Sequence, residues 1–299
     1  MVNSIIIPTR NRPKLLRRLV LSIVTEQKFG FEIIVVDSSD KEMRCPELAD
    51  ERDINYIVTD IQSAAVQRNL GLDNMKDGDY VFFLDDDVLP TRDYFVDCIE
   101  GLSKDGVTGI SGIAKSRHES YQRGKPAGAS GLFRVFFLLD SRRDGVLLKS
   151  GVNVPVRSSG EFAQEVDWLI GCSAWKKNFI GTTRFEEDFV GQSLAEDVIF
   201  SVRMRRKGTL VTDSRIILIH EESEIERPQR KEFWKMWVEN RYRLVSVADF
   251  GLVGILSFWW ANLGQLLILS ISYITKKRYT KGSCSGLIGG CIEVIRTPR

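Results

Sequence analysis

Short apolar runs, each ending at a proline or at acidic side chains, recur through the first third of the chain. Residues 5–7, 33–36 and 81–84 form such runs, and their length and composition predict buried strands, the first of which begins at Ser4. Residues 13–27 and 61–75 predict helices between these strands. Strands that alternate with helices indicate an α/β fold, in which a doubly wound, mostly parallel sheet carries helices on both faces.

The later part of the chain is less regular. Residues 115–164 are rich in Gly, Ser, Arg and Lys, and residues 132–139 form one apolar island among them. A regular sequence pattern resumes at residues 166–175. The remaining periodic segments predict a helix over 94–102, a strand over 107–114, a helix that opens within 194–200 and ends near 207, a strand over 216–219 and a helix over 232–247.

Three adjacent carboxylates, Asp85, Asp86 and Asp87, follow the apolar run that ends at Leu84. Such side chains repel one another, and each ionised carboxylate is costly near an apolar core. A bound divalent cation removes this cost, and hard oxygen ligands suit Mg²⁺ or Mn²⁺. An acidic turn at a solvated sheet edge would give the same pattern, so the triplet alone leaves both interpretations open.

Other polar side chains follow the first two strands. Because ligands of doubly wound sheets bind at the carboxyl ends of the strands, these side chains are candidate binding residues. Asp37 would accept hydrogen bonds from a base or ribose, while Arg10 and Arg12 would face phosphate.

Five short motifs together resemble the family-two glycosyltransferases of GT-A fold, which are inverting, metal-dependent enzymes that use nucleotide sugars. The motifs occur in the family's order over roughly residues 3–245. They are Ile7-Pro8-Thr9-Arg10-Asn11-Arg12, Val36-Asp37-Ser38-Ser39-Asp40, Ala64-Ala65-Val66-Gln67-Arg68-Asn69-Leu70-Gly71, Phe83-Leu84-Asp85-Asp86-Asp87 and Leu194-Ala195-Glu196-Asp197.

The resemblance implies roles for particular residues. Asp87 would be the principal metal ligand, Asp85 would serve the ribose or the metal, and His220 would be a further ligand. An exposed helical Arg68 and a structural His220 are the alternatives. The nucleotide-sugar contacts implied are Pro8, Thr9, Arg10, Arg12, Asp37, Arg68, Asp85, Asp86 and Gly171.

Glu196 and Asp197 resemble the family's catalytic-base motif, with Asp197 the first candidate and Glu196 the second. The reaction needs one carboxylate to take a proton from the acceptor hydroxyl, while the anomeric carbon is attacked opposite the leaving diphosphate. Acidic residues in the first turn of a helix also stabilise it through its dipole, which is the structural alternative.

Composition and local motifs argue against several other classes of protein. The 299 residues carry a formal net charge of +2, which gives no broad basic field for nucleic acid. The five widely spaced cysteines indicate a reducing compartment and neither a disulfide framework nor a zinc site. A nucleotidyltransferase would have a Gly-rich loop after its first strand, where this chain has Pro8-Thr9-Arg10-Asn11.

Residues 250–275 contain no charged side chain. An uncharged apolar segment of this length normally predicts a transmembrane helix. Asn262, Gly264 and Gln265 lie at the centre, and basic residues such as Lys276 and Lys277 follow. Because positive residues favour the cytoplasmic side, we expect both ends inside, with the segment either re-entering through a central break or lying in the interface. A buried hairpin in a soluble protein is the alternative.

These observations predict a catalytic domain over 1–247 and a membrane-associating region over 248–299. The expected function is transfer of a sugar from a nucleotide diphosphate sugar, UDP first and dTDP next, to a hydroxyl of a lipid-linked or polysaccharide acceptor. The expected place is the cytoplasmic face of a cell membrane, the inner membrane if the source is bacterial. A non-catalytic sugar-nucleotide-binding subunit of a glycan-assembly complex is the alternative.

Overall fold

The computed structural model describes residues 2–26, 30–116, 126–157, 163–188, 195–221, 230–276 and 282–296. The chain divides into two compact units, of which the first comprises residues 1–122 and 158–223 and the second 123–157 and 224–299. The second unit therefore begins earlier than residue 248 and takes in a central segment of the chain. The range 1–247 for the catalytic domain stays a prediction.

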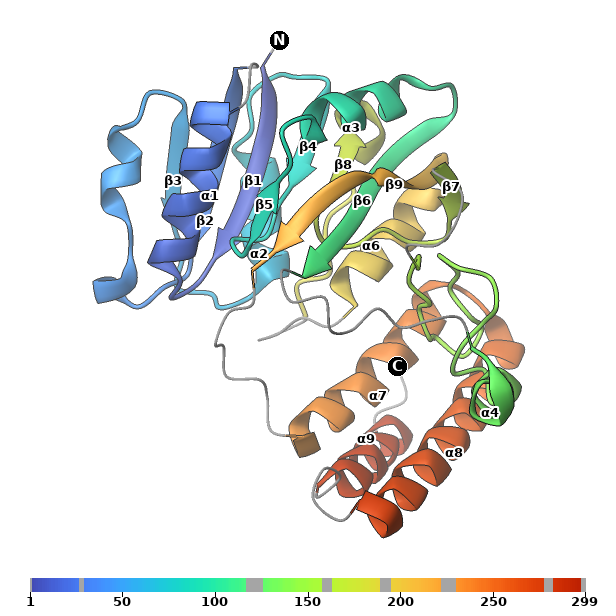
Figure 1. Cartoon of the computed structure of the whole chain (residues 1–299). Helices are drawn as coiled ribbons and strands as arrows, with labels where there is room; N and C mark the ends of the chain where they lie inside the picture. The colour runs from blue at the N-terminus through green and yellow to red at the C-terminus, as the bar shows by residue number, and fades with distance from the viewer. Residues whose placement is uncertain are drawn as a thin grey trace. The chain divides into compact units, whose positions relative to one another are not determined.

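The described strands of the first unit form one nine-stranded sheet in the order β3-β2-β1-β4-β8-β6-β9-β5, with β7 paired to β9 (Figure 1). Neighbours are parallel from β3 to β4 and between β6 and β9, whereas β8, β5 and β7 pair antiparallel. The α/β fold is confirmed, but the sheet is mixed in its second half. The strands are β1 Asn3–Thr9, β2 Phe31–Asp37, β3 Ile54–Val58, β4 Tyr80–Phe83, β5 Val88–Pro90, β6 Val107–Ser116, β7 Ala163–Val166, β8 Ser173–Lys176 and β9 Thr209–His220.

Helices cover both faces of this sheet, as the alternating side chains of a strand require. Ile5 and Phe82 share one core cluster with α1 and α3, while Phe83 packs edge-on against Phe200 of α6. On the second face α2 approaches β1 so closely that a Cβ at Gly71 would lie 2.4 Å from Ile6. The helices are α1 Pro13–Glu26, α2 Ala64–Asp73, α3 Tyr94–Ser103, α5 Lys177–Ile180 and α6 Glu196–Arg205.

Strand β1 continues through Pro8 to Thr9, so the expectation that Pro8 ends it is wrong. The ladder between β1 and β4 extends only from Ser4 to Ile6. The Ile6 carbonyl accepts a hydrogen bond from the Leu84 N–H, so the backbone polar groups of Ile6 point toward β4. Those of Pro8, two residues later, point the same way, where the β4 ladder has already ended. The ladder with β2 is therefore left intact as far as Thr9.

The second unit is helical and contains α4 Gly128–Phe136, α7 Arg230–Val247, α8 Gly251–Lys276 and α9 Ser283–Arg296. Its core joins α7, α8 and α9 through Val238, Phe258 and Leu287. The pattern of residues 115–164 did not predict α4, whereas its lack of periodicity agrees with the irregular described segment after that helix, residues 137–157. The α9 helix was also not anticipated.

The α8 helix is continuous, so the expected break at Asn262, Gly264 and Gln265 is wrong. Asn262 and Gln265 are buried, and Asn262 accepts a hydrogen bond of 3.1 Å from Arg241 of α7. Gly264 lies where any Cβ would overlap Phe137. These three residues therefore serve contacts within the unit. Among the described residues, α8 is the one helix long and apolar enough to cross a membrane, and 39% of its most apolar stretch is buried.

Candidate active site

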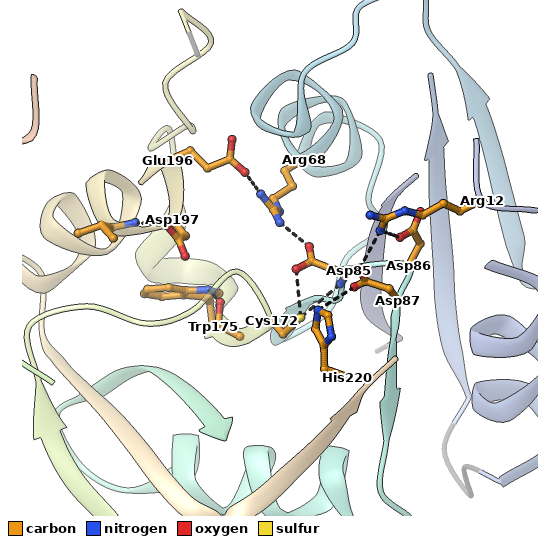
Figure 2. Close-up of polar contacts among 12 residues, drawn as sticks. Arg12, Arg68, Asp85, Asp86, Asp87, Cys172, Trp175, Glu196, Asp197 and His220 are labelled. Carbon is orange, nitrogen blue, oxygen red and sulfur yellow. Dashed lines mark hydrogen bonds and ion pairs between the residues drawn. The ribbon is translucent and has the colours of Figure 1, made fainter. Parts of the chain in front are cut away.

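The acidic triplet lies in the turn between β4 and β5, at the carboxyl edge of the central parallel strands (Figure 2). β4 is buried beside β1, so the chain is still largely covered by protein where it leaves the core at the end of this strand. Asp86 and Asp87 are buried, and Asp85 is half-buried. The strand-end position that the sequence predicted for the triplet agrees with the structure.

Arg12 and Thr9 hold the second carboxylate of the triplet. Nη1 of Arg12 donates to Asp86 at 2.6 Å and to Asp87 at 2.8 Å, and the Thr9 hydroxyl donates to Asp86 at 2.7 Å. Burial nevertheless raises the pKa of Asp86 to about 6, and burial with the nearby Asp85 charge raises the pKa of Asp87. One arginine therefore offsets only part of the negative charge, and a cation would stabilise the ionised carboxylates.

Asp87 and His220 fit the ligands of one divalent cation. Oδ1 of Asp87 lies 3.7 Å from Nε2 of His220, because β5 and β9 pair with Val88 opposite His220. Two atoms bound to one cation at about 2.1 Å each lie no more than about 4.2 Å apart, so the distance is compatible. Among the described residues, no group of three His, Cys, Asp or Glu side chains has metal-binding geometry. Protein atoms alone thus supply a pair of candidate ligands.

Arg68 joins the acidic turn to the start of α6. This buried side chain donates through Nη2 to Asp85 at 2.7 Å and through Nη1 to Glu196 (Figure 2). Burial lowers the pKa of Arg68, but the Glu196 and Asp85 carboxylates outweigh it and leave the pKa raised. The alternative of an exposed helical arginine is therefore wrong. A Cβ at Gly171 would come within 3.0 Å of Nη2 of Arg68, so glycine leaves room for this arginine.

Asp197 has the electrostatics of a general base. It follows Glu196 in the first turn of α6, and its Oδ1 accepts a hydrogen bond of 2.8 Å from the Val198 N–H. Burial and the Glu196 carboxylate raise the pKa of Asp197 to about 7, although Arg68 opposes them. A base with a pKa near 7 is efficient at neutral pH. Ala195 precedes the pair with a φ of 75°, a strained conformation for a residue other than glycine.

Asp37 lies at the carboxyl end of β2, and its carboxylate is already engaged. It accepts hydrogen bonds from the Ser39 N–H at 2.7 Å and from the Tyr56 hydroxyl. Pro8 lies within β1, and Arg10 is solvent-exposed. The structure brings together Arg12, Arg68, the triplet, His220 and the Glu196–Asp197 pair. The nucleotide-sugar roles of Pro8, Arg10 and Asp37 stay predictions.

Sequence reasoning missed two supporting contacts. Nε2 of Gln67 donates to the carbonyls of Thr9 and Val36, which joins α2 to the ends of β1 and β2. Sγ of Cys172 lies 3.5 Å from a carboxylate oxygen of Asp85. Gln67 lies in a recognised motif next to Arg68, so its position was a usable signal. Gly171, the residue before Cys172, was already implied as a nucleotide-sugar contact together with Asp85, so the position of Cys172 was a usable signal as well.

Comparisons with known proteins identify the family. The glycosyl transferase family 2 profile matches residues 4–160, and the chain belongs to this family. The chain is 29% identical to the glycosyltransferase GlyA of Streptococcus pneumoniae serotype 4 over 178 residues, 58% of this chain and 24% of GlyA. It is 37% identical to an uncharacterised Haemophilus influenzae glycosyltransferase over 89 residues, 28% of this chain and 29% of that protein. The chain thus matches less than a third of each relative's length.

Solved structures confirm the GT-A fold. S. aureus TarS 1-349 in complex with UDP-GlcNAc is similar with a TM-score of 0.62 and 17% identity, over 99% of this chain and 81% of that chain. The mannosyltransferase PcManGT of Pyrobaculum calidifontis, in complex with GDP-Man and Mn²⁺, is similar with a TM-score of 0.57 and 16% identity, over 98% of this chain and 86% of that chain. The family, the fold and the relatives' names classify the chain as a glycosyltransferase.

Proposed function

We propose that this chain transfers a sugar, with inversion, from a nucleotide diphosphate sugar to a hydroxyl of a lipid-linked or polysaccharide acceptor. UDP is the first candidate nucleotide and dTDP the second. The observation that carries the proposal is the arrangement of two clusters of carboxylates around Arg68. Asp85 to Asp87 lie on one side of it, and Glu196 and Asp197 lie on the other. The cluster Asp85 to Asp87 suits binding of the metal and the leaving diphosphate. The pair Glu196 and Asp197 suits removal of the proton from the acceptor hydroxyl.

Asp197 takes the proton of the acceptor hydroxyl in this proposal. Its pKa of about 7 leaves a substantial fraction ionised at neutral pH. Glu196 is less suited to the role, because its carboxylate is engaged by Arg68. The charge of Arg68 also lies between the two acidic groups, where it limits their repulsion.

Asp87 and His220 are the side chains that would hold Mg²⁺ or Mn²⁺. Such an ion supplies Lewis-acid stabilisation of the leaving diphosphate. Arg12 contacts Asp87 from the other side and orients its carboxylate toward the His220 imidazole. Mn²⁺ in the structure of PcManGT with GDP-Man supports a metal in this fold.

A donor panel tests the proposal. Purified protein is incubated with UDP-, dTDP- and GDP-sugars and Mn²⁺, and release of nucleoside diphosphate is measured with and without EDTA. We expect one nucleotide class to be hydrolysed, UDP first, and hydrolysis to stop in EDTA. Tight binding of a sugar nucleotide without hydrolysis or transfer would instead favour a non-catalytic binding subunit. Activity unchanged in excess EDTA would contradict the metal.

A further inference from the structure

One side of α8 presents a continuous row of exposed apolar side chains, referred to below as the outer face. Their spacing of three and four residues places them on one side of the helix. Leu256 is 61% exposed and Ile274 is 75% exposed. The outer face comprises Leu252, Leu256, Trp260, Leu263, Leu267, Ile271 and Ile274.

Helix α4 widens this surface. Phe136 is 64% exposed, its ring centroid lies 5.3 Å from that of Trp260, and its carbonyl accepts a hydrogen bond of 2.9 Å from the Trp260 indole. Leu132, one turn earlier in α4, is exposed as well. Such a broad apolar surface is more than the scattered exposed residues of an ordinary soluble protein.

The opposite side of α8 packs against other helices of the second unit. Phe258 and Leu269 belong to the core shared with α7 and α9, and Asn262 bonds to the buried Arg241. The α7 helix also carries Lys235 and Glu239, which form an ion pair. A helix held in this way cannot be surrounded by lipid unless the charged residues of α7 enter the membrane with it.

We propose that the outer face, with Leu132 and Phe136, binds an anionic membrane surface, so that α8 lies in the plane of the interface and does not cross the bilayer. The partner follows from charge as well as apolarity. Residues 250–299 contain six basic side chains and one acidic one, although the whole chain has a net charge of only +2. Basic residues beside an apolar helix are typical of binding to anionic lipid. This inference does not depend on the proposed sugar transfer.

A second copy of the chain fits this surface less well. Two α8 helices would need axes about 8–10 Å apart to pack their outer faces. Phe136 lies beside Trp260, in the middle of the row, and obstructs that approach.

Vesicle flotation with the full chain tests the inference. Protein is mixed with phosphatidylcholine vesicles with or without about 30% phosphatidylglycerol and floated through sucrose, which separates bound protein from aggregates. The double variant Leu256→Glu with Leu263→Glu places charge on the outer face. The control, Leu21→Glu with Val24→Glu, changes two exposed apolar residues of α1 in the first unit, where Leu21 is 62% and Val24 58% exposed.

The unchanged chain should float with anionic vesicles and bind neutral ones at least tenfold less. The outer-face variant should lose binding at least tenfold while its melting temperature stays unchanged, and the α1 control should float normally. Washing at pH 11 should release the protein. Binding that survives this wash would indicate a crossing helix, and equal flotation of both variants would overturn the assigned surface. A dimer that the outer-face variant dissociates, without vesicle binding by the unchanged chain, would identify a second copy instead.

Discussion

Asp197 is the residue with which the proposed transfer can be tested most directly. Asp197→Asn keeps the shape of the side chain but removes its basicity, so we expect transfer to fall by a factor on the order of 10²–10⁴ while donor binding remains. Because the base acts only when ionised, kcat/KM of the unchanged protein should rise with pH through about 7 and level off above it. The rising limb should disappear in Asp197→Asn.

The neighbouring carboxylate provides the comparison for this prediction. If Glu196→Gln loses transfer and Asp197→Asn does not, the two roles are exchanged. Retention of most activity by both variants would remove the acid–base part of the mechanism.

Substitution of the single residue Asp87 tests the proposed metal site. Asp87→Ala should abolish Mn²⁺-dependent donor hydrolysis, and His220→Ala should weaken Mn²⁺ binding on the order of 10–100-fold. Binding is measured by calorimetric titration of Mn²⁺ with donor present. Asp105→Ala removes an exposed carboxylate elsewhere in the first unit and should change neither quantity. Undiminished Mn²⁺ affinity in Asp87→Ala would place the ion elsewhere.

At the scale of elements, the site depends on how closely the segment before β8 approaches α2. Gly171→Ala would place a Cβ 3.0 Å from Arg68 Nη2 and 3.5 Å from a carboxylate oxygen of Asp85. Because two carboxylates fix Arg68, we expect its displacement to reduce transfer about 10–100-fold with little change in melting temperature. Gly30→Ala, whose added Cβ meets nothing within 4 Å, is the matched control and should leave transfer unchanged. Full activity in Gly171→Ala would show that the position of Arg68 is not critical.

At the scale of the whole molecule, α7 depends on the residues that follow it. Val238 and Val245 of α7 are buried in the core shared with α8 and α9. A chain ending at Val247 would expose them, so we expect it to aggregate or to lose the ordered environment of Trp234 and Trp237. Near-ultraviolet circular dichroism and size-exclusion chromatography measure this. A chain ending at Arg296 should behave like the full chain, and a soluble 1–247 fragment with an unchanged spectrum would contradict the prediction.

The sequence alone determined the local features of this protein. The apolar runs predicted β1, β2 and β4, and the acids after Leu84 were placed correctly at a strand end, because a buried strand and its exit can be read from adjacent residues. The five motifs identified the family, which the family profile confirmed. The uncharged run over residues 250–275 predicted an apolar element, although the break expected at its centre does not exist, because α8 is continuous.

Only the tertiary structure decided the contacts between distant residues. Arg68 and Glu196 are 128 positions apart, and the pairing of β5 with β9 brings His220 to Asp87. Their distances, and the raised pKa of Asp197, depend on burial and on neighbours from other elements. The antiparallel insertion of β8 beside β4 and the separation of α8 into a buried side and an outer face have the same origin. A local pattern gives the tendency of a segment to bury apolar side chains, but the partner that buries them is set by the packing of the whole unit.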